Sequence, residues 1–516
     1  MSKNEFLNNM VKETGIVETT NGAIVYNSTF DSLLDFYSEA GSMRGYPEEE
    51  IIELFEEAYK EDKLRAIKCV FYLGDILGGQ GERNTFRILI KHIANTYPEA
   101  LKSNLKLIPK FNRWDSIYEL FDTPLEESAI ELIKEQLLMD LRSKNKSLCA
   151  KWLKSVNTSS KESNRLGKKT ARLLNLGNFV NPDSFDSKKR NEFIYRKVLS
   201  ALRKDTNVVE TKMSSSNWDS IEYSAVPSKA MNIYQNAFYK HDRASFEEFA
   251  NSLSNGDTKL NSKALYPYEI VRKILNGKVK TNIEKKIIEG QWNNLPNYIT
   301  NPEMKGLCVV DVSGSMHGTP LEVAVSTGLY VAERCSGVYH NKFITFSERP
   351  KIVDIKGLSI MEKVRNIANS DWGYNTNLEA VFDLVLNTAV RNNAKQDDIP
   401  DYLIIISDMN WDDLESRRYN PSSYDKTFIN TIKARFEEAG YEMPVLVLWN
   451  VDSSGSVPMS SDENGWISVS GYSPTIFKAL LSEELLGADE IVREDINPIK
   501  AMLVVLDGDR YKDIII

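Results

Sequence analysis

Residues 307–316 read Leu307-Cys308-Val309-Val310-Asp311-Val312-Ser313-Gly314-Ser315-Met316, an apolar run that leads into one carboxylate and two hydroxyls at alternate positions. A short apolar run of this kind is typical of a central parallel strand that is covered on both faces. The residues from Pro320 to Cys335 predict a buried helix with proline in its first turn. A strand, a polar loop and a helix in this order place a ligand site at the carboxyl end of a sheet.

The same alternation continues along the rest of the chain. Further strands are predicted at residues 340–347, 351–355, 402–406 and 445–449, and helices at 377–391 and 426–440. Alternating strands and helices predict a doubly wound, Rossmann-like α/β domain with helices on both faces of a parallel sheet. In such a sheet Asp311 and Asp408 both follow carboxyl strand ends, so we expect them to meet at one site.

The side chains expected at this edge offer oxygen ligands. Hard divalent cations prefer carboxylate and hydroxyl oxygens, so we predict a cation site, with Mg²⁺ ahead of Mn²⁺ or Ca²⁺. The alternative interpretation is that Asp311 caps the following helix while Ser313 and Ser315 fill a polar turn.

Length and composition bound the class of protein. A chain of 516 residues with 42% apolar residues is expected to contain more than one packed domain. The amino terminus has no signal-peptide pattern and no apolar run is long enough for a membrane helix, so we expect a protein of the cytoplasm, or of the host cytoplasm if the chain is viral. The four cysteines lie far apart, which favours reduced thiols over a zinc site. The sequence has no phosphate-binding loop and no nucleophile elbow, and we expect no enzymatic activity.

The first three hundred residues carry apolar side chains at three- and four-residue spacing. Successive helices joined by short turns predict a helical-repeat (HEAT-like) array that forms a solenoid or a ring. We therefore expect an amino-terminal extension at 1–28, a helical domain at 29–300 and the α/β domain at 301–516. A mobile basic loop is expected at 157–190, where serine, asparagine and lysine are frequent.

One stretch of the helical domain is strongly basic. Residues 142–204 hold 17 basic and 4 acidic side chains, although the whole chain has a net charge of −9. Positive charge on this scale predicts binding to RNA through its phosphates. The predicted contact residues are Arg142, Lys144, Lys146, Lys151, Lys154, Lys161, Arg165, Lys168, Lys169, Arg172, Lys188, Lys189, Arg190, Arg196, Lys197, Arg203 and Lys204. The alternatives are a solvated helical face or an acidic protein partner.

Aromatic residues lie among these basic side chains. Trp152, Phe179 and Tyr195 could stack on unpaired bases, but core packing is the favoured interpretation. We interpret Arg83 and the Trp114-Asp115 pair as structural anchors of the array, without a chemical role.

Several motifs together resemble a known family. They are Phe71-Tyr72-Leu73-Gly74-Asp75-Ile76-Leu77-Gly78-Gly79-Gln80-Gly81-Glu82-Arg83, Pro109-Lys110-Phe111-Asn112-Arg113-Trp114-Asp115, Leu148-Cys149-Ala150-Lys151-Trp152-Leu153 and Val226-Pro227-Ser228-Lys229-Ala230. In this order, and followed by Asp-x-Ser-x-Ser, they resemble Ro autoantigen-like proteins, in which a TROVE module precedes a von Willebrand factor A domain. The resemblance is closest to an uncharacterised branch found in viruses and eukaryotes.

This resemblance implies a site and a function. It implies a metal-ion-dependent adhesion site whose ligands are Asp311, Ser313, Ser315, Thr376 and Asp408. An acidic group of a protein or ligand would complete the coordination of the ion. The resemblance also implies a monomeric, ring-shaped ribonucleoprotein that binds small noncoding or misfolded RNA, structured or single-stranded.

Three functions remain open at this point. The first is a non-enzymatic RNA-binding scaffold that also carries a partner-binding metal site. The second is a metal-dependent protein interaction adaptor that does not bind RNA. The third and least favoured is a metal-dependent nuclease, because the sequence offers no second carboxylate cluster for a pair of ions.

Overall fold

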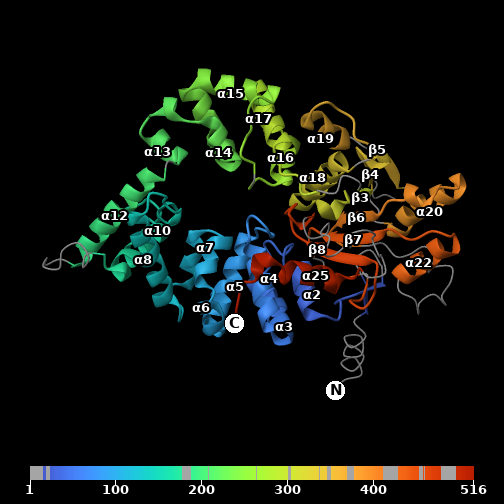
Figure 1. Ribbon diagram of the computed structural model, residues 1–516, viewed down its shortest axis with the longest axis horizontal. Helices are drawn as coiled ribbons and strands as arrows, with labels where there is room; N and C mark the ends of the chain where they lie inside the picture. The colour runs from blue at the N-terminus through green and yellow to red at the C-terminus, as the bar shows by residue number, and fades with distance from the viewer. Residues whose placement is uncertain are drawn as a thin grey trace.

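The computed structural model describes residues 16–18, 24–176, 187–206, 208–262, 264–299, 304–335, 337–345, 350–368, 377–410, 428–452, 457, 459–477 and 496–516. Figure 1 shows a helical part, which runs from blue to yellow-green, beside a part that contains a sheet. This division into a helical amino-terminal region and an α/β region confirms the prediction at that level.

The helical part consists of consecutive helices joined by short connections. They are α2 (Ser32–Glu39), α3 (Glu48–Glu61), α4 (Lys63–Gly74), α5 (Arg83–Thr96), α6 (Pro98–Lys102), α7 (Ile108–Phe111), α8 (Glu126–Arg142), α9 (Cys149–Trp152), α10 (Lys161–Leu174), α12 (Ser187–Asp205), α13 (Val209–Ser214), α14 (Ser228–His241), α15 (Arg243–Asn255), α16 (Pro267–Leu275) and α17 (Asn282–Asn293). Asp62 separates α3 from α4, and its carboxylate accepts a hydrogen bond from the Arg65 amide. A side-chain cap of this kind satisfies an amide that the first turn leaves unpaired.

Part of the predicted basic loop is helical. Residues 161–174 form α10 and residues 187–190 begin α12, so the prediction of a loop at 157–190 is wrong for these residues. Leu166, Ala171 and Leu174 are buried on one face of α10, at a spacing that the many lysines and serines obscure in the sequence. Residues 177–186 lie outside the described part of the chain.

The sheet contains six strands in the order β5-β4-β3-β6-β7-β8. The strands are β3 (Gly306–Val310), β4 (Lys342–Thr345), β5 (Lys351–Asp354), β6 (Tyr402–Ser407), β7 (Val445–Asn450) and β8 (Trp466–Ser470). Among these described strands only the β4–β5 pair is antiparallel, so the sheet is mixed rather than purely parallel. The predicted strands and the helices α18 (Thr319–Arg334), α20 (Leu378–Asn392) and α22 (Phe428–Glu438) are present, with ends within a few residues of expectation.

Both faces of the sheet are buried. Along β3, Cys308 and Val310 face one apolar core, whereas Leu307 and Val309 face another. Helix α18 packs against β3 in the first core, and α20 supplies Val381 to the second. A strand that is buried on both faces has apolar residues at consecutive positions in the sequence. This pattern made β3, β6 and β7 predictable.

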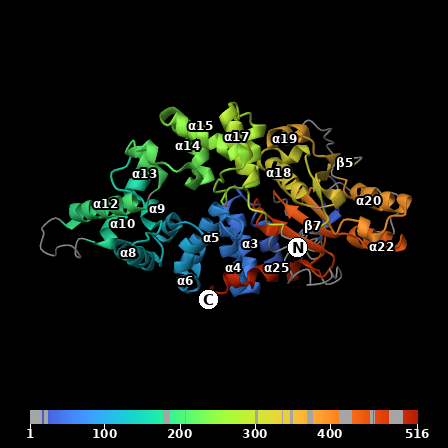
Figure 2. The same cartoon turned by 45° about the horizontal axis from the view of Figure 1, so that its top comes forward.

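The helical part contacts the sheet-containing part at both of its ends. Helix α2 packs against β8 and against α25 (Pro498–Leu506), while α16 packs against α18. The two ends of the helical part also contact each other, because the Arg44 guanidinium donates to the Tyr268 hydroxyl at 3.3 Å. The chain thus forms a closed circuit, which both views display (Figures 1 and 2).

The carboxyl-terminal segment fastens this circuit. The Asp75 carboxylate is fully buried and accepts hydrogen bonds from Arg510, at 2.6 Å from Nη2, and from the Tyr511 hydroxyl at 3.0 Å. Asp507 pairs with Arg65 at 2.8 Å and with Lys68 at 2.7 Å. Helix α4 and its flanking loop are therefore held by residues more than four hundred positions away.

Two short strands precede the helices, in the segment expected to be an extension. They are β1 (Ile16–Glu18) and β2 (Ile24–Tyr26), which pair in antiparallel fashion. The Tyr26 backbone also pairs with Val457, so the described part of this segment touches the sheet-containing region. No helix among the described ranges is both long and apolar enough to cross a membrane.

Candidate functional site

The predicted cation site lies at the carboxyl ends of β3 and β6. Val310 and Ile406 are register partners, so Asp311 and Ser407 leave neighbouring strands at the same edge. The Ser407 hydroxyl donates to Asp311 Oδ2 at 2.6 Å, and the Ser313 amide donates to Asp311 Oδ1 at 2.9 Å. The strand order reverses here, because β4 lies on one side of β3 and β6 on the other, and such a switch point favours ligand binding.

The serines of the motif lie together on the loop after β3. The Ser313 and Ser315 hydroxyl oxygens are 3.0 Å apart, and Ser315 belongs to a short turn of helix at Gly314–Met316. Ser315 is exposed, whereas Asp311 is fully buried behind it. The loop therefore brings two hydroxyl oxygens to the entrance of a buried carboxylate.

The surroundings of Asp311 disfavour the ionised form of its carboxyl group. Burial, together with the nearby Asp408, raises the pKa of this carboxyl to about 6, although hydrogen bonds from Ser407 and Ser313 act in the opposite direction. Asp408 is buried as well, and its Oδ1 accepts a hydrogen bond from the Asn410 amide at 3.1 Å. Within the described part of the chain neither carboxylate forms an ion pair with a basic side chain. Two buried carboxylates without a counter-charge are suited to a divalent cation.

The donor set fits a hard cation only if hydroxyl groups take part. Among the described residues, no three His, Cys, Asp or Glu side chains gather as a metal-binding group. Asp311 and Asp408 would therefore supply the charge, and Ser313 and Ser315 would supply neutral oxygens. The fifth predicted ligand, Thr376, lies outside the described residues, so its place in the site stays a prediction.

A third carboxylate near this edge was missed in the sequence. Asp452 follows β7, and burial and then Asp408 raise its pKa. The hydroxyl of Tyr46, from the loop between α2 and α3, lies 3.5 Å from Asp452 Oδ1. The available signal was its position shortly after a predicted parallel strand, as Asp408 follows the strand before it.

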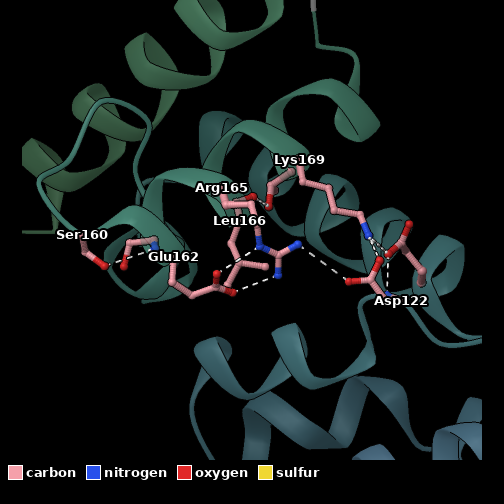
Figure 3. Close-up of polar contacts among 9 residues, drawn as sticks. Asp122, Ser160, Glu162, Arg165, Leu166 and Lys169 are labelled. Carbon is pink, nitrogen blue, oxygen red and sulfur yellow. Dashed lines mark hydrogen bonds and ion pairs between the residues drawn. The ribbon is translucent and has the colours of Figure 1, made fainter.

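The predicted RNA-binding residues lie on α8, α9, α10, α12 and their connections. Figure 3 shows two that are neutralised within the protein: Arg165 pairs with Glu162 at 2.9 Å, and Lys169 contacts both Asp122 and Glu126. Other pairs join Lys146 to Asp205, Lys151 to Glu210 and Arg172 to Glu192. Arg203 is a structural residue, because its guanidinium donates to the Ala150 and Leu153 carbonyls and to Ser155.

The remaining basic residues of the set lack such partners. Within the described residues the following eight form no ion pair: Arg142, Lys144, Lys154, Lys161, Lys168, Arg196, Lys197 and Lys204. Arg190 does have an interaction partner, and the side chains of Lys188 and Lys189 lie outside the described part. The predicted surface is thus reduced to about half of its charge, and we call these eight residues the free basic surface.

The described aromatic residues near these basic side chains differ in their exposure. Tyr195 is fully buried and donates to the Lys154 carbonyl at 2.8 Å, and the Trp152 ring lies 3.9 Å from the Arg113 guanidinium carbon. Phe179 lies outside the described residues. Sequence reasoning missed Phe193, which is 52% exposed and lies beside Arg196 and Lys197 at 5.7 and 5.6 Å. An exposed ring beside two cations can stack on an unpaired base.

Comparisons with known proteins match nearly the whole chain. The model of a domain of unknown function, DUF2828, matches residues 19–113 and 114–302, which is more than half of the chain. A second domain of unknown function, DUF7788, matches residues 305–502. Uncharacterized protein L728 of Acanthamoeba polyphaga mimivirus is 29% identical over 538 residues, which cover 95% of this chain and 87% of the mimivirus protein.

These matches overturn the resemblance to Ro autoantigen-like proteins. The matching models are DUF2828 and DUF7788, a different family, so the assignment to the TROVE and von Willebrand factor A architecture is wrong. The motifs that suggested it are short, and short motifs mark a local turn or site more reliably than a family. What can be said of function therefore depends on the residues themselves.

Proposed function

The chain belongs to the DUF2828 family, and we propose that it is a non-enzymatic RNA-binding scaffold with a divalent-cation site at the carboxyl edge of its sheet. The free basic surface is the single observation that carries the RNA part of this proposal. Its side chains come from helices that are consecutive in the chain, and their charges lack acidic partners within the described residues. Binding of unneutralised cations to phosphates releases counterions from the nucleic acid, which gives salt-dependent affinity.

The cation site supports a second, separate role. Asp311 and Asp408 supply negative charge, Ser315 is exposed, and a carboxylate of a protein or ligand could complete the coordination of Mg²⁺. The alternative function, an adaptor without RNA, would use this site alone. Asp311, Asp408 and Asp452 do not gather as a group of three metal-binding carboxylates among the described residues, whereas a nuclease that holds two ions about 4 Å apart needs such a cluster.

Reversing the free basic surface tests the RNA proposal. We expect a variant with Lys161, Lys168, Arg196 and Lys197 changed to glutamate to lose at least about tenfold in affinity for RNA at low salt, because removing cations that face phosphates lowers both the affinity and its salt dependence. The measurement is fluorescence anisotropy with a labelled single-stranded and a labelled hairpin RNA, across a salt series. Sequencing of nucleic acid that copurifies with the wild-type protein at low salt identifies the natural ligand.

A matched control removes the effect of net charge. Lys259, Lys278, Lys280 and Lys285 are exposed lysines on the α15–α17 side of the helical part, without an ion pair among the described residues. Changing these four to glutamate alters the net charge by the same amount. RNA affinity that falls equally in both variants, or no RNA binding by the wild type, would contradict the scaffold. RNA cleavage in Mg²⁺ would support the nuclease instead.

A further inference from the structure

Four arginines gather where α5 begins. Arg83 is the first residue of α5 and Arg87 lies one turn later, while Arg113 precedes the turn of helix at Trp114–Leu120. Arg44 and Arg113 both act electrostatically on Arg83, as does Arg87. The cluster is separate from the free basic surface, but the turn that follows Arg113 approaches it, since Lys154 lies 5.9 Å from the Tyr118 ring.

Three of these arginines have acidic partners and the fourth has none. Glu82 binds Arg44 at 2.5 Å. Asp115 is shared, because its Oδ2 lies 2.9 Å from Arg87 and also contacts Arg113; a more distant acid, Glu119, lies 3.9 Å from Arg87. The Arg83 side chain forms neither a hydrogen bond nor an ion pair with any described residue. The expected anchoring role of Arg83 thus has no direct side-chain contact behind it among the described residues, whereas the buried Asp115 is such an anchor.

The position of Arg83 is electrostatically unfavourable in the protein alone. Partial desolvation, followed by the charges of Arg113 and Arg87, lowers the pKa of its guanidinium, although the residue is exposed. The amino-terminal end of α5 adds further positive potential at the same place. Asp115 and Glu82 attract this charge, but neither forms an ion pair with it, so a ligand of negative charge would relieve the repulsion among the arginines.

The neighbouring arginines are fixed in place before any ligand arrives. Arg87 Nε donates to the Ser116 hydroxyl at 3.2 Å, and Arg113 is held between Asp115 and the Trp152 ring. Guanidinium groups recognise phosphate through two parallel N–H donors, and side chains already ordered lose little entropy on binding. The arrangement suits a compact anion with several oxygen acceptors.

We propose that Arg83, with Arg87 and Arg113 beside it, forms a site for a phosphate group. This inference rests on the proposed RNA-binding function for the source of that phosphate, which is then a backbone phosphate of the RNA on the free basic surface. Free phosphate has the same chemistry and is the alternative source. Arg83 supplies a charge that forms no ion pair among the described residues, and Arg87 and Arg113 supply additional donors.

The test compares Arg83→Gln with Arg243→Gln in the full chain. Arg243 is an exposed arginine of α15 that pairs with Glu247 at 2.9 Å, so it controls for the loss of one surface charge. The two probes are a labelled oligouridylate, followed by fluorescence anisotropy across a salt series, and inorganic phosphate, followed by the shift in Tm. We expect Arg83→Gln to weaken oligouridylate binding about fivefold and to reduce the salt slope by about 1. We also expect it to abolish the Tm increase with phosphate, while Arg243→Gln behaves as the wild type.

A stability measurement separates the loss of a ligand site from damage to the fold. Without ligand, Arg83→Gln should have a Tm equal to or above that of the wild type, because the substitution relieves repulsion among like charges. A lower Tm would identify Arg83 as a structural residue and overturn the inference. Binding of both probes at wild-type strength by Arg83→Gln would also overturn it, and would leave the RNA proposal intact if reversal of the free basic surface still abolishes RNA binding.

The remaining outcome distinguishes the two sources of phosphate. If oligouridylate does not bind the wild type, but phosphate raises the Tm of the wild type and not that of Arg83→Gln, the arginine site holds free phosphate. The proposed RNA-binding function then fails while the phosphate site stands.

Discussion

Replacing Asp75 with alanine is expected to lower the free energy of unfolding by about 3–5 kcal/mol, because it leaves the partners of a buried carboxylate unpaired. The carboxylate is fully buried and accepts from Arg510, from the Tyr511 hydroxyl at 3.0 Å and from the Leu77 and Gly78 amides at 3.0 and 3.1 Å. Without it, the two amides and the hydroxyl lose an acceptor inside the protein. The measurement is urea unfolding at neutral pH, monitored by tryptophan fluorescence.

Asp509→Ala is the control for this substitution. Asp509 lies in the same carboxyl-terminal segment, but its side chain is 96% exposed and pairs with Lys512 alone among the described residues. Exposed pairs of this kind contribute little, so we expect a change within about 0.5 kcal/mol. Equal effects of the two substitutions would contradict the assignment of Asp75 as the residue that fastens the carboxyl-terminal segment to the helical part. Asp75→Asn should give an intermediate loss, since an amide can still accept from the backbone but cannot balance Arg510.

The second large effect is expected at Asp311, where the effect of Asp311→Asn on stability should be opposite in EDTA and in Mg²⁺. In EDTA we expect Asp311→Asn to be more stable than the wild type above pH 7, by at most about 3 kcal/mol, because the native pKa of about 6 lies above the ordinary 3.8. An acid whose pKa is raised on folding contributes its full stability below the unfolded pKa and loses it as the pH rises through the folded pKa. The stability of the wild type relative to Asp311→Asn should therefore fall between about pH 4 and pH 7.

Saturating Mg²⁺ should reverse this order. A cation that binds only the native state adds about 2.7 kcal/mol at a hundredfold excess over its Kd, and Asp311→Asn removes half of the charge that would hold it. Thermal unfolding with and without Mg²⁺ at pH 8 measures the effect. Asp397→Asn is the control, because Asp397 is 94% exposed and lies beside Lys305, which precedes β3 and is therefore at the opposite end of the strand from Asp311. A Mg²⁺-dependent increase in Tm that is as large in Asp311→Asn as in the wild type would exclude this carboxylate as a ligand.

The strands that build the candidate site could be predicted because each is buried on both faces. Such a strand has only apolar residues until it ends, so Val310 and Ile406 identify Asp311 and Ser407 as the first polar residues at one edge. Strand β8 was missed because it is short, contains two serines and follows a segment without a helical pattern. Burial of Ser468 and Ser470 depends on partners far away in the chain, such as the Gly41 amide, which lies 3.2 Å from the Ser470 hydroxyl.

The basic residues illustrate what a count of charges omits. Lys168 and Lys169 are adjacent and identical in the sequence, but only Lys169 reaches Asp122 and Glu126 on a neighbouring segment. Arg83 and Arg87 differ in the same way, since Asp115 accepts one of them and not the other. Whether a basic side chain forms an ion pair depends on its neighbours in the folded structure. A count of basic residues in the sequence therefore overestimates the charge that is free to bind a ligand.

The link between Asp75 and the carboxyl-terminal segment has a consequence for synthesis of the chain. Asp75 and Arg510 are 435 residues apart, so at about 5–20 residues per second the ribosome needs roughly 20–90 s to supply the partner of this carboxylate. During that time α2 and α4 have emerged without α25, against which their apolar side chains pack in the finished protein. The nascent helical part must therefore remain incompletely packed until translation is almost over, which makes it a natural client for chaperones that hold exposed apolar surface.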